Sequence, residues 1–91
     1  MIIEIFGKDF CPYCDKAVRV AQQFIQETEH KYTYQKLDRD FTREELFEKF
    51  PGARTFPQIR IDGENIGGYT EFEAWALSKW NLSANTVITH S

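Results

Sequence analysis

Two cysteines three positions apart, Cys11 and Cys14, are the residues of this sequence best suited to carry chemistry. Such a pair can open and close a disulfide, and the attacking form of the first cysteine is the thiolate. The pair follows a loop and enters an amphipathic segment that begins at Pro12. We therefore expect Cys11 at a helix N-terminus, where the amides of Tyr13 and Cys14 stabilise its thiolate and lower its pKa. Cys14, on the apolar stripe of that helix, is the predicted resolving thiol.

This arrangement predicts an exchange reaction that needs no metal and no bound cofactor. Thiolate Cys11 attacks a target disulfide and forms a mixed disulfide, which Cys14 resolves as the 11–14 disulfide closes. A structural staple and half of a zinc site are the competing interpretations. A staple across so short a loop constrains the unfolded chain little. Zinc lacks ligands because His30 and His90 stand in no ligand spacing with each other or with the cysteines.

The composition restricts the partners and the location of the protein. With 91 residues the chain fits one small domain, and its net charge of −3 offers no basic face for nucleic acid. No apolar run approaches the roughly 20 residues of a membrane span, and Met1 leads into a short apolar stretch broken by Glu4, unlike a signal peptide. Two cysteines are too few for a secreted disulfide framework, so a cytoplasmic location is expected. A monomer is expected because no heptad pattern is present.

Apolar periodicity and turn signals predict an α/β chain of order βαβαββα. The first strand is expected to be buried on both faces, and two capping boxes, Thr42 with Glu45 and Thr70 with Glu73, are expected to open the second and third helices. The expected fold is one four-stranded mixed sheet with helices on both faces. The predicted strands cover residues 2–6, 32–37, 58–61 and 64–66, with a turn at Asp62-Gly63, and the predicted helices cover 12–29, 43–50 and 70–80. The domain thus spans 1–80, and 81–91 form a tail without predicted structure.

Four segments resemble the glutaredoxin family in their residues and in their order along the chain. They are Ile5-Phe6-Gly7-Lys8, Cys11-Pro12-Tyr13-Cys14, Thr55-Phe56-Pro57-Gln58-Ile59 and Ile66-Gly67-Gly68-Tyr69-Thr70-Glu71-Phe72. The resemblance runs from Met1 to about Trp80 and is greatest to the short bacterial and phage dithiol glutaredoxins that supply electrons to ribonucleotide reductase. It implies a thioredoxin fold, glutathione as the reducing cosubstrate, and protein disulfides or glutathionylated thiols as substrates, with ribonucleotide reductase among the candidate acceptors.

The same resemblance implies which residues bind glutathione. Pro57 would be a cis-proline whose loop faces Cys11, which leaves the backbone of Phe56 to pair with an extended substrate. Phe56 stands where the family commonly has Val, and Glu71 replaces a more usual Asp as the partner of the γ-glutamyl amino group. Lys8 would meet the glycine carboxylate. The full predicted glutathione-binding set is Lys8, Tyr13, Thr55, Phe56, Pro57, Gly68, Tyr69, Thr70 and Glu71.

Plainer interpretations of these segments stay open. Pro57 could merely begin a strand, and the glycine pair could form a turn before a capped helix that binds no ligand. Lys8 could be an ordinary solvated lysine. Arg39 could assist Lys8 at the same carboxylate, or it could pair with Asp40 on the surface.

Two other functions also stay open. The first is a redoxin served by thioredoxin reductase, which would share the fold and the cysteine pair. The second is a binding module in which two copies share a [2Fe-2S] cluster through Cys11 and glutathione. The rigid Pro12 directly after Cys11 disfavours the cluster.

Overall fold

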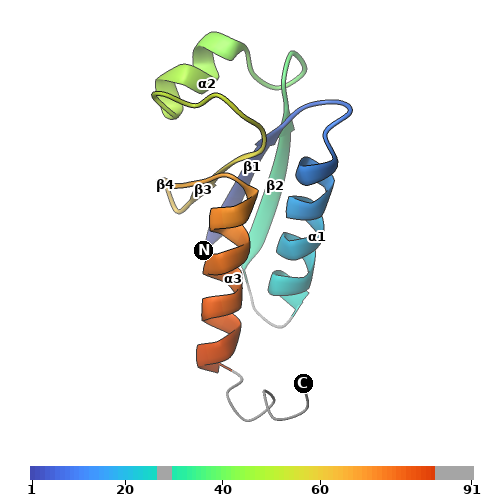
Figure 1. Cartoon of the computed structure of the whole chain (residues 1–91), viewed down its shortest axis with the longest axis vertical. Helices are drawn as coiled ribbons and strands as arrows, with labels where there is room; N and C mark the ends of the chain where they lie inside the picture. Colours follow the sequence, from blue (N-terminus) through green and yellow to red (C-terminus); the bar gives the residue numbers. More distant parts are fainter. Residues whose placement is uncertain (27–29, 84–91) are drawn as a thin grey trace.

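The computed structural model describes residues 1–26 and 30–83, with the backbone alone for 80–83. Its elements follow the predicted order βαβαββα (Figure 1). They are β1 (Ile2–Gly7), α1 (Pro12–Gln26), β2 (Lys31–Lys36), α2 (Arg43–Lys49), β3 (Gln58–Ile61), β4 (Glu64–Gly67) and α3 (Tyr69–Ser83). His90 and residues 84–91 of the predicted tail lie outside the described residues.

In the described part of the chain the strands form a four-stranded mixed sheet of order β2-β1-β3-β4. β1 pairs in parallel with β2 and antiparallel with β3, and β4 is antiparallel to β3. The β3–β4 hairpin turns at Asp62 and Gly63, whose φ angles of 51° and 83° are those of a tight hairpin turn. α1 and α3 lie together against one face of the sheet, and α2 packs on the other (Figure 1). The predicted fold class is confirmed.

Side chains alternate between the two faces of the sheet along β1, so this strand contributes residues to two hydrophobic clusters, one on each face. Ile3 and Ile5 belong to the larger cluster, which also contains buried residues of α1, β3 and α3. Phe6 belongs to the smaller cluster beneath α2, where its ring centroid lies 5.3 Å from those of Phe41 and Phe50 in edge-on contacts. The central strand is therefore anchored from both sides close to the end that leads to the cysteines.

β1 is not buried along its whole length, contrary to the prediction. Ile2 is 51% exposed and Glu4 is half-buried. Arg60 of β3 is paired with Glu4 in the antiparallel register and donates to it twice, from Nε to Oε1 at 2.7 Å and from a terminal nitrogen to Oε2 at 3.1 Å. These two charge-assisted hydrogen bonds satisfy the Glu4 carboxylate, which is a charged group in the otherwise apolar strand β1.

Element bounds differ from the prediction by a few residues, and the first predicted capping box is confirmed. α1 ends at Gln26, with 27–29 outside the described residues. α3 continues to Ser83, past its predicted end at Trp80, whose side chain also lies outside the described ones. At α2 the Glu45 amide donates to Thr42 Oγ1 at 3.2 Å, and the Thr42 amide donates to Glu45 Oε1 at 2.8 Å.

The Glu4–Arg60 pair makes stability depend on pH in a testable way. The Arg60 guanidinium lowers the pKa of the Glu4 carboxyl below its ordinary value of 4.5. The ion pair therefore contributes fully to the free energy of unfolding at pH values above the pKa that Glu4 has in the unfolded chain. This contribution is lost as the pH falls through the lower pKa that Glu4 has in the folded protein. We predict that Glu4→Gln decreases the free energy of unfolding by about 1 to 3 kcal/mol at pH 7, and that this difference from wild type shrinks at pH 3.

Urea unfolding at both pH values measures the two effects. Glu48→Gln, which changes an exposed carboxylate on α2, is the control and should match wild type at both. A difference between Glu4→Gln and wild type that stays the same from pH 7 to pH 3 would contradict the role given to the ion pair.

Candidate functional site

The cysteine pair lies at the start of α1, one loop beyond the end of β1. Cys11 and Cys14 are joined by a disulfide, with 5.2 Å between their Cα atoms. The Cys11 carbonyl accepts from the amides of Cys14 at 3.1 Å and Asp15 at 3.2 Å, so Cys11 caps the helix. The Cys14 amide also donates to Cys11 Sγ at 3.2 Å. The predicted placement of Cys11 is confirmed, and the donor to its sulfur is the amide of Cys14.

The two sulfurs differ in their exposure. Cys11 is half-buried, whereas Cys14 is 0% exposed and lies among the buried residues of α1. Gly7 helps to enclose Cys14, because a Cβ on Gly7 would lie 3.0 Å from Cys14 Sγ and 2.7 Å from the hydroxyl oxygen of Tyr34. A substrate can therefore approach Cys11, whereas Cys14 is shielded from solvent.

A cis-proline loop reaches the same end of the sheet. The Phe56–Pro57 peptide is cis, as the family resemblance implies, and Pro57 is buried. Gln58 Nε2 donates to the Thr55 carbonyl at 2.8 Å and so fixes the loop. β3 begins at Gln58 opposite Phe6, which places the loop next to the end of β1 from which the cysteine loop departs.

One cavity of about 290 Å³ is lined by eight of the nine residues predicted to bind glutathione. They are Tyr13, Thr55, Phe56, Pro57, Gly68, Tyr69, Thr70 and Glu71, from α1, the cis-proline loop and the segment that opens α3. The ninth residue, Lys8, is exposed and does not line this cavity. The Lys8 ammonium lies 5.5 Å from the centroid of the Phe56 ring, which belongs to the cis-proline loop.

α3 begins earlier than predicted, and the predicted capping box of Thr70 and Glu73 is wrong. The N-cap is Gly68, whose amide donates to Glu71 Oε1 at 2.9 Å. Gly67, with a φ of 125°, occupies a conformation that side chains rarely adopt and lets the chain turn directly from β4 into the helix. The glutamate three residues after the N-cap therefore fills the capping role that was predicted for the next glutamate.

The first turn of α3 offers hydrogen-bond donors to a ligand. The first intrahelical bond runs from the Phe72 amide to the Gly68 carbonyl at 3.0 Å, so the preceding amides of Tyr69, Thr70 and Glu71 have no acceptor within the helix. Amides at the positive end of a helix dipole suit a carboxylate. The Tyr69 hydroxyl is engaged elsewhere, because it donates to Glu73 at 2.8 Å, which raises the Tyr69 pKa.

Arg39 is paired within its own loop. Its Nε and one terminal nitrogen donate to Asp40 Oδ2 at 2.9 and 2.8 Å, and the same oxygen accepts from the Lys36 amide at 2.9 Å. These contacts favour the surface ion pair over a role for Arg39 beside Lys8.

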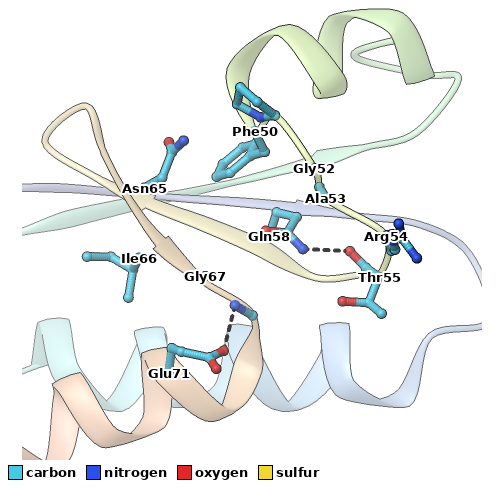
Figure 2. Close-up of a pocket in the computed structure, with 12 residues that line it drawn as sticks. Phe50, Gly52, Ala53, Arg54, Thr55, Gln58, Asn65, Ile66, Gly67 and Glu71 are labelled. Atoms are coloured by element: carbon cyan, nitrogen blue, oxygen red, sulfur yellow. Dashed lines mark hydrogen bonds between the residues drawn. The ribbon is translucent and has the colours of Figure 1, made fainter.

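A larger cavity of about 550 Å³ adjoins the first one, between the loop that follows α2 and strand β4 (Figure 2). The two cavities share Thr55, Gly68 and Glu71. Figure 2 shows Gln58 reaching to the Thr55 carbonyl and Glu71 turning back to the amide that opens α3. The sequence-based prediction missed Gln58 as the anchor of the loop. Its signal was a polar residue directly after Pro57, at the first position of the predicted strand.

Among the described residues, no group of three or more His, Cys, Asp or Glu side chains could hold a metal ion. None of the helices described is long and apolar enough to cross a membrane.

Comparisons with known proteins agree with this geometry. The family model described as Glutaredoxin matches residues 3–66. Glutaredoxin 1 of Salmonella typhimurium is 39% identical over 89 residues, which cover 92% of this chain and 100% of the relative. Glutaredoxin 1 of Escherichia coli is 40% identical over 84 residues, covering 88% and 95%. The structure of reduced Escherichia coli glutaredoxin matches with a TM-score of 0.78 at 39% identity, covering 92% of this chain and 100% of that one.

The unequal burial of the sulfurs predicts unequal labelling after reduction. We expect iodoacetamide at pH 7 to modify Cys11 within minutes, although an ordinary cysteine with a pKa of about 8.5 reacts slowly there. Cys14 should react only after unfolding. Fragment-ion mass spectrometry assigns the label, and Cys11→Ser serves as the control that should stay largely unmodified. Faster labelling of Cys14 than of Cys11 would reverse the assigned order.

Proposed function

The chain belongs to the glutaredoxin family and is a dithiol thiol-disulfide oxidoreductase, and from this premise we propose that it uses glutathione to reduce protein disulfides and glutathionylated thiols. The observation that carries the proposal is the smaller cavity, because its lining combines a cis-proline loop, the first turn of α3 and the Glu71 carboxylate. Glutathione presents the matching groups, namely an extended cysteinyl backbone, a γ-glutamyl carboxylate and an ammonium.

Three parts of glutathione are then assigned to groups of this chain. The backbone of Phe56 pairs with the cysteinyl residue of glutathione as an added strand would. The first-turn amides of α3 receive the γ-glutamyl carboxylate, and Glu71 receives the ammonium. Lys8, whose ammonium lies over the Phe56 ring at 5.5 Å, meets the glycine carboxylate.

The reductive half of the cycle begins at the accessible sulfur. Thiolate Cys11 attacks one sulfur of the target disulfide, so a Cys11–target bond forms, the target bond breaks, and the leaving thiolate takes a proton. Cys14 then loses its proton and attacks the Cys11 sulfur. The target leaves as its second thiol. The target has then gained two electrons, and the protein has lost two electrons in forming the 11–14 disulfide. The closed disulfide described above is the product of this step.

Two molecules of glutathione return the protein to its dithiol form. The first attacks the Cys11 sulfur, since Cys14 is 0% exposed, and releases Cys14 as a thiol. The second attacks the glutathione sulfur of that mixed disulfide, which releases Cys11 and glutathione disulfide. In sum, one target disulfide is reduced to two thiols and two glutathiones are oxidised to one disulfide.

We propose further that the protein works in the cytoplasm as a monomer, with ribonucleotide reductase among its electron acceptors. The likeness to short bacterial dithiol glutaredoxins supports the acceptor, and a lone pair of redox cysteines in the sequence supports the reducing compartment. The rigid Pro12 beside Cys11 disfavours a shared [2Fe-2S] cluster, so anaerobic reconstitution is expected to leave the protein colourless.

The source of electrons is tested by coupling the protein to either of two reductase systems. We expect NADPH consumption with glutathione and glutathione reductase, on both a protein disulfide and a glutathione mixed disulfide. With thioredoxin reductase in their place, consumption should stay at the rate measured without this protein. Turnover that required thioredoxin reductase would assign the protein to the alternative class of redoxins.

The two cysteines should give different defects. Cys11→Ser is expected to lose all measurable turnover because it lacks the attacking thiolate. Cys14→Ser is expected to lose reduction of protein disulfides, which needs intramolecular closure, and to keep the removal of glutathione from mixed disulfides. Steady-state rates on the two substrate types measure the difference. Equal loss on both substrates in both variants would contradict the assigned roles.

A further inference from the structure

Phe10, the residue directly before Cys11, holds its ring entirely in solvent. It is 101% exposed, and the next most exposed large apolar side chain among the described residues is Tyr13 at 53%. The backbone of Phe10 has a φ of 55°, a left-handed conformation that is a genuine outlier for a bulky residue. Both the exposure of the ring and the backbone conformation are unfavourable in the isolated protein, and strain of this kind gathers at functional sites.

The loop around Phe10 is tied down on either side of it. Asp9 forms an ion pair with Lys36 of β2 at 2.8 Å, and the Lys8 carbonyl accepts from the Tyr34 hydroxyl at 3.4 Å. On the other side, Cys11 caps α1 and is held by its disulfide. The ring therefore projects from a loop that is anchored before and after it.

Phe10 stands outside the cavity assigned to glutathione. The aromatic rings of that lining come from Tyr13, Phe56 and Tyr69, and Phe10 is absent from it. Tyr13 is already engaged on its own side, with Tyr69 at 5.7 Å between ring centroids and the Lys16 ammonium at 4.9 Å. Phe10 is thus the sequence neighbour of Cys11 and lies outside the lining assigned to the small cosubstrate.

We propose that Phe10 is a specificity-determining residue for protein substrates, and that its ring packs on an apolar side chain next to the substrate cysteine. The side chain that packs on Phe10 is identified by the geometry of the reaction. In the mixed disulfide the Cα atoms of Cys11 and the substrate cysteine are held about 5.5 to 6 Å apart. The neighbours of the substrate cysteine then lie within reach of residue 10, which is the neighbour of Cys11. The proposal rests on the proposed attack by Cys11, and it is independent of the source of electrons.

The test uses two symmetric peptide disulfides that differ only in the residue before cysteine, Leu in one and Ser in the other. A glutathione mixed disulfide of 2-mercaptoethanol is the small substrate. Pre-reduced protein is mixed with each substrate in a single turnover and quenched with acid, and the products are separated by chromatography. No free glutathione is needed and the two peptides contain none, so failure of the glutathione proposal would leave the comparison of the two peptides intact.

The variants separate the ring from the backbone. Phe10→Asn removes the ring and tolerates a positive φ, and Phe10→Tyr keeps a ring. Phe47→Gln is the matched control, because Phe47 is an exposed phenylalanine, 47% exposed, on α2. We expect wild type to prefer the Leu peptide on the order of tenfold. Phe10→Asn should abolish the preference and keep the rate on the small substrate, whereas Phe10→Tyr and Phe47→Gln should match wild type.

Three results would overturn the proposal. The first is a preference for the Leu peptide that persists in Phe10→Asn. The second is an equal loss in Phe10→Asn on all three substrates, which would mean that the loop positions Cys11 instead of selecting a partner. The third is a wild-type dimer in sedimentation velocity that Phe10→Asn dissociates, because the ring would then cover a second copy of this chain.

Discussion

The spacing of two sulfurs within one turn of α1 is the constraint on which the rest of the structure depends. Cys11 can stand at the open end of a helix while Cys14 faces the core only if the helix begins at Pro12 and packs its apolar stripe on the sheet. β1 must then end where the loop to the helix begins. The clusters on both faces of β1 fix that end, because packed interiors resist displacement.

The same anchoring sets the partners of the cysteine pair. The antiparallel register that opposes Phe6 and Gln58 delivers the cis-proline loop to the end of β1, and Gln58 then holds the loop through the Thr55 carbonyl. β4 lies beside β3 and passes through Gly67 into α3, so the first turn of α3 arrives at the same place. Three segments far apart in sequence thus meet because β1, β3 and β4 place them at the same end of the sheet.

Local signals in the sequence predicted the element order, the Thr42–Glu45 capping box and the hairpin turn at Asp62, because each is decided by residues a few positions apart. The start of α3 was mispredicted because Glu71 and Glu73 both stand near a possible cap. Which one is used depends on the backbone of Gly67, which no pattern of side chains specifies. The family resemblance identified residues that the fold brings into one cavity. Phe10 was missed because its exposure arises from tertiary placement. Gln58 was missed because its bond to the Thr55 carbonyl, although local, depends on the conformation of the loop between the two residues.

The close approach of Gly7 to the Cys14 sulfur also bears on damage by oxidants. Peroxide can add oxygen atoms stepwise to an accessible thiolate, and the later products are irreversible. The space between Gly7 and Cys14 is already filled, since a single carbon added to Gly7 would lie 3.0 Å from the Cys14 sulfur, and Cys14 is 0% exposed. We therefore expect hyperoxidation to fall on Cys11, and closure of the 11–14 disulfide takes that sulfur out of the thiolate form that peroxide attacks. The lack of a side chain at Gly7 thus lets the resolving thiol pack directly against the end of β1, away from oxidants in solution.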